Sequence, residues 1–371
     1  MDSSLIKKTD HSRIILLAKY IILSFLFFAF VGCPYEGDIF YQNENVIGLG
    51  QTPFEIITQN VQSNSDAYIT MANENSVLID RYYNNNFTIP VGRYPVGIAL
   101  WQAGQRLYVI NNTGLSISVL SIAQELNGSQ VIASISDPAF HHMGDAIVTA
   151  DGRYLYVATD TNAVSVISTT TDNVVTTLTD PSFNYPAHLV ADTLGRYIFV
   201  SESRGNAVSV ISTTTNTVIK TLGVGISPNG MTETTDGNWL FVVNSGSNSI
   251  SVIDVDALTI VRNVTDPGFD NPQRIVLDPV CAYALVSNYN TGNISYVSEN
   301  ALINGTGQVV AGDTPVGNNP YDLGIIPSGY TMNAVPGTNF TNTSGTAYIV
   351  VGLQGDRAIA YVNLGRGNEC N

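Results

Sequence analysis

Short apolar runs recur along the chain, and their length and spacing predict β-strands. One run reads Leu-Tyr-Val or a close variant, and its copies begin at Leu107, Leu155, Ile198, Leu240, Ala284 and Ala347, with a weaker copy at Ala67. A second run, rich in Val, Ser and Ile, follows most copies, as at Val164 and Val208. The period is about 40 to 48 residues, the length of one four-stranded propeller blade. Beyond the N-terminus no stretch shows sustained helical periodicity.

The starts of the units give the number of blades. Each unit opens with a proline, or in one case a methionine, at Pro53, Pro95, Met143, Pro186, Pro228, Pro272 and Pro320. Seven starts predict an all-β fold, a seven-bladed β-propeller with four-stranded blades. Asp-Gly pairs such as Asp151-Gly152 predict two-residue hairpin turns in which both residues have positive φ.

The two ends of the repeat array complement each other. The last unit stops after its third strand, whereas residues 45–53 align with the fourth strand of the unit that begins at Pro186. We therefore expect the N-terminal strand to complete the last blade and close the ring, which removes open sheet edges. Residues 45–371 then form a single propeller.

The N-terminus has the pattern of an export signal. Four basic residues within positions 1–20 precede the apolar run 21–32, which ends at Cys33. This run is too short to span a bilayer and is typical of a signal-peptide core. Phe30-Val-Gly-Cys33 resembles a bacterial lipobox, although it has Phe where Leu is commonest. We expect residues 1–32 to be a lipoprotein signal peptide, Cys33 to be lipidated and residues 33–44 to form a tether; the alternative is an uncleaved anchor, which a lysine at position 19 disfavours.

The repeat pattern resembles the YVTN-type β-propeller family of surface-layer and periplasmic proteins. The best matches are Asp151-Gly-Arg-Tyr-Leu-Tyr-Val-Ala and Asp236-Gly-Asn-Trp-Leu-Phe-Val-Val-Asn, each followed by a Val/Ile-Ser-Val-Ile strand. The resemblance covers residues 45–365 and extends loosely to propeller lactonases and lyases. It implies a fold rather than an activity, because propellers include binding proteins and enzymes alike.

Charge excludes one class of partner. The first 32 residues hold four of the 15 basic and two of the 30 acidic residues, so the rest of the chain has a net charge of −17. A surface this acidic repels phosphate backbones, so we expect no nucleic-acid partner.

Ionisable residues gather at one position of the repeat. The residue two after each unit start opens the innermost strand at the top mouth of the central channel, and five of the seven are Glu55, Asp145, His188, Arg274 and Asp322, the others being Gly97 and Gly230. This cluster is the candidate ligand site, and its residue types suit a small polar ligand, a cation or acid–base chemistry. The alternative is a solvated channel mouth that tolerates charge. A metal site has little support because His188 is the only histidine in the cluster.

The remaining cysteines and the known motifs add little. Cys281 and Cys370 are expected at the bottom of adjacent blades, where a disulfide and two unpaired thiols are both open interpretations. Haem, nucleotide and serine-hydrolase motifs are absent from the sequence, which supports no cofactor and assigns no catalytic residue.

These observations favour a binding protein over an enzyme. If the innermost strand runs from top to bottom, the lipid-bearing N-terminus approaches from the bottom, and the top faces away from the membrane. We expect an exported, membrane-anchored lipoprotein of the outer membrane, facing the periplasm or the surface, that binds a protein or glycan through its top face as a monomer. The alternatives are a lactonase- or lyase-like enzyme with a site at the channel mouth and a purely structural envelope component.

Overall fold

The computed structural model describes residues 46–48, 53–61, 64–81, 87–122, 130–278, 281–326 and 346–366. All of them belong to one of the two units into which the chain divides, Gly37–Cys370. The predicted signal peptide, the tether, Cys33 and Cys370 lie outside the described residues. No helix within the described ranges is both long and apolar enough to cross a membrane.

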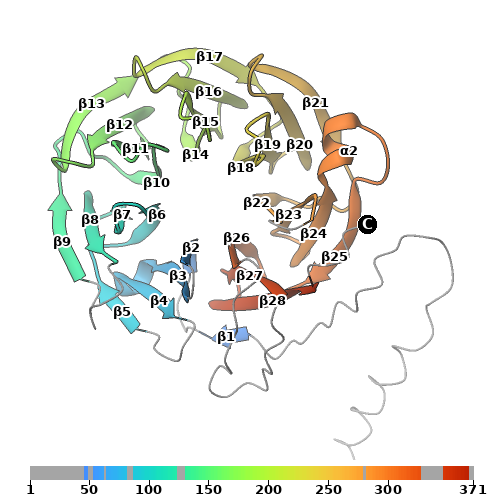
Figure 1. The fold of residues 1–371 in the computed structure, drawn as a ribbon, viewed down its shortest axis with the longest axis horizontal. Helices are drawn as coiled ribbons and strands as arrows, with labels where there is room; N and C mark the ends of the chain where they lie inside the picture. The colour runs from blue at the N-terminus through green and yellow to red at the C-terminus, as the bar shows by residue number, and fades with distance from the viewer. Residues whose placement is uncertain are drawn as a thin grey trace, which may run out of the picture. The chain divides into compact units, whose positions relative to one another are not determined.

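Seven four-stranded antiparallel sheets surround a central axis, so the predicted seven-bladed β-propeller is confirmed (Figure 1). Blade 1 consists of β2 (Pro53–Val61), β3 (Asn64–Met71), β4 (Ser76–Arg81) and β5 (Phe87–Pro90). Blade 2 consists of β6 (Pro95–Trp101), β7 (Arg106–Asn111), β8 (Ser116–Ser121) and β9 (Gln130–Ile135). Blade 3 consists of β10 (Met143–Val148), β11 (Tyr154–Thr159), β12 (Ala163–Ser168) and β13 (Asn173–Thr179). Blade 4 consists of β14 (Pro186–Ala191), β15 (Tyr197–Glu202), β16 (Ala207–Ser212) and β17 (Thr217–Gly223). Blade 5 consists of β18 (Pro228–Glu233), β19 (Trp239–Asn244), β20 (Ser249–Asp254) and β21 (Thr259–Thr265). Blade 6 consists of β22 (Pro272–Leu277), β23 (Tyr283–Asn288), β24 (Asn293–Ser298) and β25 (Val310–Pro315).

Blade 7 combines strands from both ends of the chain. Its order is β1-β28-β27-β26, with β26 (Pro320–Ile326), β27 (Thr346–Leu353), β28 (Ala358–Arg366) and β1 (Val46–Gly48). β1 pairs antiparallel with β28, with Val46 opposite Ala360 and Gly48 opposite Ala358. The outer edge of β28 is therefore covered by a strand from the start of the propeller.

The apolar runs form the second strand of each blade because they are enclosed on both faces. Leu107, Tyr108 and Val109 of β7 are all fully buried, and β15 and β19 show the same unbroken burial. The buried clusters lie between consecutive blades, as where Tyr108 packs with residues of β11. A strand sandwiched between two neighbouring sheets needs apolar residues on both faces, which explains why its sequence does not alternate.

Each innermost strand begins at a predicted unit start and carries a register shift just after it, for example between Pro53 and Ile56 and between Pro186 and His188. We call the face where these strands begin the top face. It also holds the turns between second and third strands and the loops that lead from one blade to the next. The bottom face holds the other turns.

One local expectation was wrong. The Asp-Gly pairs do not form two-residue hairpins, because only the glycines, Gly152 and Gly237, have positive φ. Asp151 accepts hydrogen bonds from Thr149 Oγ1 and Arg153 N within a longer turn. A turn of this length needs one left-handed residue, which glycine supplies.

The described residues beyond the N-terminus contain only very short helical segments, in keeping with the lack of sustained helical periodicity in the sequence. A short helix, α2 (Glu299–Asn304), connects β24 to β25, and a single 3₁₀ turn, η2 (Ala72–Glu74), connects β3 to β4. Ser298 Oγ accepts the N–H of Ala301 at the start of α2, and Gly305 ends it with φ of 69°. Six residues are too few for periodicity to show, so only the serine and glycine caps mark this helix in the sequence.

Candidate functional site

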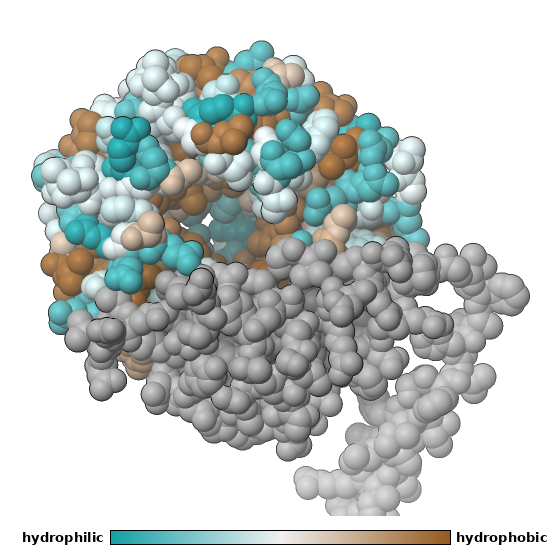
Figure 2. Space-filling model, in the orientation of Figure 1, coloured by the Kyte–Doolittle hydropathy of each residue, from teal (hydrophilic) through white to brown (hydrophobic). Residues whose placement is uncertain are grey.

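The five ionisable residues of the predicted site do lie together at the third position of the innermost strands. They are nevertheless largely buried: Glu55 is 9% exposed, Asp145 5%, Arg274 8% and Asp322 4%, and the His188 side chain is 15% exposed. We call these residues the inner ring. Figure 1 shows the innermost strands around a central axis, and Figure 2 shows an opening beside the described blades that are not covered by grey atoms. The inner ring lies on the innermost strands.

Most inner-ring side chains connect one blade to the next. Asp322 Oδ2 accepts the N–H of Ile56 in blade 1 (2.5 Å). In the same way Glu55 Oε2 accepts from Ile98 (2.9 Å), Asp145 Oδ2 from Leu189 (2.7 Å) and His188 Nδ1 from Met231 (3.3 Å). Each of these side chains accepts a hydrogen bond from a main-chain N–H that the register shift removes from the hydrogen bonding between the first and second strands of its blade. The inner ring therefore joins the first strands of consecutive blades.

The two glycines of the ring stand where the next blade leaves no room for a side chain. A Cβ on Gly97 would lie 2.3 Å from the carbonyl oxygen of Gly144, and one on Gly230 would lie 2.6 Å from that of Gln273. After Gly97, which offers no acceptor, Asp145 Oδ1 instead accepts the N–H of Ala146 in its own strand (2.7 Å). At these two junctions the main chains of adjacent innermost strands pack closely, and the glycine contributes no side-chain acceptor.

Burial governs the charge of the inner ring. It raises the pKa of Glu55 well above its ordinary value, and the nearby charges of Asp145 and Asp322 raise it further. Burial also raises the pKa of Asp322, although the Arg274 guanidinium opposes this. It lowers the pKa of His188 to about 4, so this imidazole is neutral at pH 7.

Arg274 is the cation of the ring and is held from two sides. Its Nε donates to Asp322 Oδ1 (3.0 Å) and its Nη1 donates to Asn229 Oδ1 (3.0 Å), while Cζ lies 5.5 Å from the centre of the Tyr321 ring. Burial alone lowers the pKa of Arg274, but the attraction of Asp322 and the other neighbours outweighs it and raises the pKa overall. Arg274 therefore stays charged and compensates Asp322 in a site with little access to water.

The hydrogen bonds also fix the tautomer of His188. Because Nδ1 accepts the N–H of Met231, the proton of the neutral ring is on Nε2, which lies 3.6 Å from Asp145 Oδ2. Both ring nitrogens thus face protein groups, so acid–base work on a bound molecule would require His188 to leave them. Within the described ranges no three His, Cys, Asp or Glu side chains are grouped to hold a metal ion.

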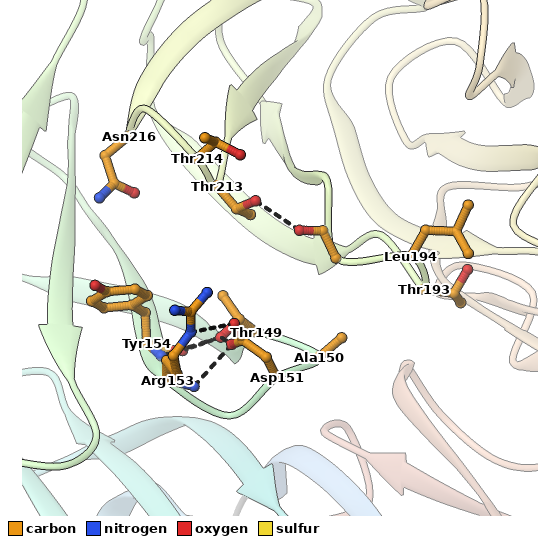
Figure 3. Close-up of a pocket in the computed structure, with 11 residues that line it drawn as sticks. Thr149, Ala150, Asp151, Arg153, Tyr154, Thr193, Leu194, Thr213, Thr214 and Asn216 are labelled. Atoms are coloured by element: carbon orange, nitrogen blue, oxygen red, sulfur yellow. Dashed lines mark hydrogen bonds and ion pairs between the residues drawn. The ribbon is translucent and has the colours of Figure 1, made fainter.

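A second concavity, which the sequence analysis missed, lies on the bottom face between blades 3 and 4 (Figure 3). It has a volume of about 580 Å³ and is lined by turn residues that include Thr149, Asp151, Arg153, Leu194 and Thr213. The Arg153 guanidinium is paired with Asp151 (Nε to Oδ2, 2.5 Å). The hydroxyls of Thr149 and Thr213 donate to main-chain carbonyl oxygens of nearby turn residues. Its sequence signal is the run of threonines in the bottom turns, which is hard to separate from ordinary turn composition.

Cys281 lies in the bottom turn between β22 and β23 and is disulfide-bonded. Its predicted partner, Cys370, lies outside the described residues, so this particular pairing stays a prediction.

With the geometry established, comparisons with known proteins define the class as a seven-bladed β-propeller. A family model described as "Lactonase, 7-bladed beta-propeller" matches residues 70–223, from the end of β3 to the end of β17. No curated protein sequence gives a significant match. The narrower resemblance to YVTN-type repeats stays a prediction.

Two solved structures illustrate the likeness of the whole ring. Hydrazine synthase of Kuenenia stuttgartiensis aligns with a TM-score of 0.67 at 15% identity, over 90% of this chain and 99% of that one. Virginiamycin B lyase from Staphylococcus aureus aligns with a TM-score of 0.65 at 14% identity, over 86% of this chain and 97% of that one. At such low identity these likenesses show the fold alone.

Proposed function

We propose that this protein is a binding module of the cell envelope, anchored by lipid at Cys33, whose top face engages a protein or glycan partner. Its propeller would hold the top face away from the membrane, because β1, the strand that follows the tether in the sequence, begins on the bottom side of the last blade. The lipobox resemblance supports lipid as the contact with the membrane. The net negative charge argues against a nucleic-acid partner.

The observation that carries the proposal is the distribution of exposed apolar side chains. Among the described residues, four large ones are exposed on the top face, namely Tyr94 (37%), Leu115 (41%), Tyr185 (40%) and Ile226 (55%), and only Leu194 (67%) on the bottom. The others lie on the outermost strands. Exposed aromatic and apolar side chains grouped on one face are typical of binding surfaces.

The main chain holds two of these tyrosines in place. Tyr94 and Tyr185 both have positive φ, which is uncommon for bulky residues. The N–H of Tyr94 donates to Asn75 Oδ1 and that of Tyr185 to Asn162 Oδ1, each at 2.8 Å. The equivalent residues Ser227, Asn271 and Asn319 also have positive φ, so this conformation belongs to the repeat. A main chain held in this way loses less entropy on binding.

A photo-crosslinking amino acid tests the proposal on intact cells. Placed at Ile226 on the top face it should give a defined adduct, while the same amino acid at Leu194 on the bottom face, which is at least as exposed, should give none. Equal adducts at both positions, or none at either, would contradict the proposal. Acyl labelling of the wild type and its loss in Cys33→Ala test the anchor separately.

A second candidate is a lactonase- or lyase-like enzyme with its site at the channel mouth. The lactonase family match and the Asp145–His188 pair, 3.6 Å apart, favour it. Its difficulty is that both groups already accept main-chain N–H groups of neighbouring blades. Turnover of a lactone panel by the wild type, abolished in His188→Asn, would establish it, because Asn Oδ1 can replace Nδ1 as the acceptor for Met231 but cannot transfer protons at neutral pH.

A further inference from the structure

A rim of seven residues lies directly above the inner ring, at the second position of each innermost strand. These residues are Phe54, Val96, Gly144, Ala187, Asn229, Gln273 and Tyr321. All seven are half-buried, whereas the first and third residues of nearly all these strands are buried, so the rim residues face the mouth of the channel. Their chemistry changes around the ring. Blades 7 to 2 supply aromatic and aliphatic groups, blades 3 and 4 only small residues, and blades 5 and 6 carboxamides.

The aromatic part of the rim is continuous with the top face. The ring of Phe54 contacts those of Tyr94 and Tyr321 edge to face, with centroids 6.2 and 5.7 Å apart. Arg274 in turn lies against Tyr321. Three rings from three blades thus form one wall that remains partly open to solvent.

The opposite wall is an ordered set of amides. Asn229 Nδ2 donates to Gln273 Oε1 (2.8 Å), and Gln273 Nε2 donates to Asn271 Oδ1 (2.7 Å). Asn229 Oδ1 already accepts from Arg274 Nη1. This network fixes the planes of both carboxamides, and each keeps hydrogen-bonding capacity: Asn229 one N–H and one lone pair, Gln273 one lone pair.

Between the two walls the rim is open. A Cβ on Gly144 would meet no atom within 4 Å, and the next blade contributes only Ala187. Below the opening, Arg274 uses two of its five N–H groups on Asp322 and Asn229, which leaves donors on a cation whose charge is already compensated. The acidic surroundings disfavour an anionic ligand, and an isolated cation would meet the like charge of Arg274.

We infer that this rim binds an uncharged sugar ring at the end of a glycan. A pyranose has an apolar C–H face that packs on aromatic rings and neighbouring hydroxyls that pair with fixed carboxamides. The rim offers these two kinds of surface on opposite sides of one opening. This inference rests on the proposed top-face binding role and names the class of ligand.

A glycan array with the labelled soluble propeller, residues 34–371, tests the inference. It should bind neutral glycans with an accessible terminal pyranose and leave sialylated or uronic-acid termini unbound. Phe54→Ala and Asn229→Ala should each weaken binding of the best glycan at least tenfold, and both substitutions place a residue that blade 4 already has at this position, Ala187. The control Leu194→Ala, on the bottom face, should bind as the wild type does.

Two further measurements keep the test decisive. Tyr94→Asn should also weaken binding while retaining the fold, because asparagine tolerates positive φ and stands at the equivalent place in blades 6 and 7 as Asn271 and Asn319. Equal melting temperatures of the variants and wild type exclude unfolding as the cause. Binding of acidic glycans only, or binding that Phe54→Ala and Asn229→Ala leave unchanged, would overturn the inference. A protein adduct at Ile226 without any glycan binding would overturn it too, yet leave the proposed function standing, whereas loss of both would remove the proposed function as well.

Discussion

Glu202 offers a direct test of how the propeller handles buried charge. It ends β15 with no exposed surface, and its Oε2 accepts the N–H of Asn184 (2.7 Å) while its Oε1 has no hydrogen-bond partner. Blades 2, 5 and 6 have asparagine at this place, and in blade 5 Asn244 Nδ2 donates to Ser251 Oγ (2.9 Å). Ser209 occupies the place of Ser251 in blade 4. Glu202→Gln should therefore keep the bond to Asn184 and gain a donor toward Ser209.

The magnitude follows from the pKa. Burial raises the pKa of Glu202 from 4.5 to about 7, opposed in part by the hydrogen bond from the N–H of Asn184. An acid whose pKa is raised by folding stabilises the fold below pH 4.5, and that contribution is lost as the pH rises to about 7. At about 1.4 kcal/mol per pKa unit, ionisation costs the wild type roughly 3 kcal/mol at pH 8. Glu202→Gln avoids this cost, so its gain in the free energy of unfolding should be about 2–3 kcal/mol at pH 8 and close to zero at pH 4.5.

Urea denaturation of wild type and variant at pH 4.5, 6 and 8 measures this difference. His188, whose pKa is lowered, destabilises the fold as the pH falls from about 6.5 toward 4, but it does so equally in both proteins and cancels in the comparison. The exposed Glu74→Gln serves as the charge-matched control and should change stability by less than about 0.5 kcal/mol at every pH. A gain at pH 8 no larger than at pH 4.5 would refute the reasoning.

Three further outcomes follow from the same packing. Gly97→Ala should cost about 1–3 kcal/mol because its Cβ meets a carbonyl oxygen, whereas Gly144→Ala, with open space around it, should not destabilise; thermal melts of the pair decide this. Arg274→Met should cost about 3–5 kcal/mol by leaving Asp322 buried without its cation, and adding Asp322→Asn should recover part of that loss in urea melts; equal stability of single and double variants would contradict it. Peptide mapping under non-reducing conditions should find Cys281 in a bridge, and a quantitatively alkylated Cys281 before reduction would exclude one.

The blade boundaries could be predicted because the repeat marks them chemically. Pro53, Met143 and the other unit starts are the first residues of the innermost strands, and two positions later the ionisable residues do come together. Sequence repetition alone aligned these positions, and the ring symmetry brought them to one place. The repeat could not reveal the environment of the side chains. Their burial, and their hydrogen bonds to the main chain of the next blade, depend on how closely adjacent innermost strands approach.

Other features were beyond the sequence for related reasons. The glycines at 97 and 230 look like ordinary repeat residues until the neighbouring carbonyl oxygen shows why no Cβ fits. The rim at the second position has no consistent residue type, since Phe54 and Asn229 share only a register position. The second concavity on the bottom face is lined by separate turns of blades 3 and 4, and no repeat position marks how those turns come together.

The central claim is that the inner ring holds the blades together while the top face binds the partner. Recovery of the top-face ligand by two variants tests this claim most directly. The variants are His188→Asn in the inner ring and Tyr94→Asn in the top-face loop beside the rim, each normalised to wild type and to folded protein. We predict that His188→Asn retains binding, since asparagine still accepts the N–H of Met231, and that Tyr94→Asn loses most of it. Loss of binding in His188→Asn with full binding in Tyr94→Asn would contradict the account and place the site within the inner ring.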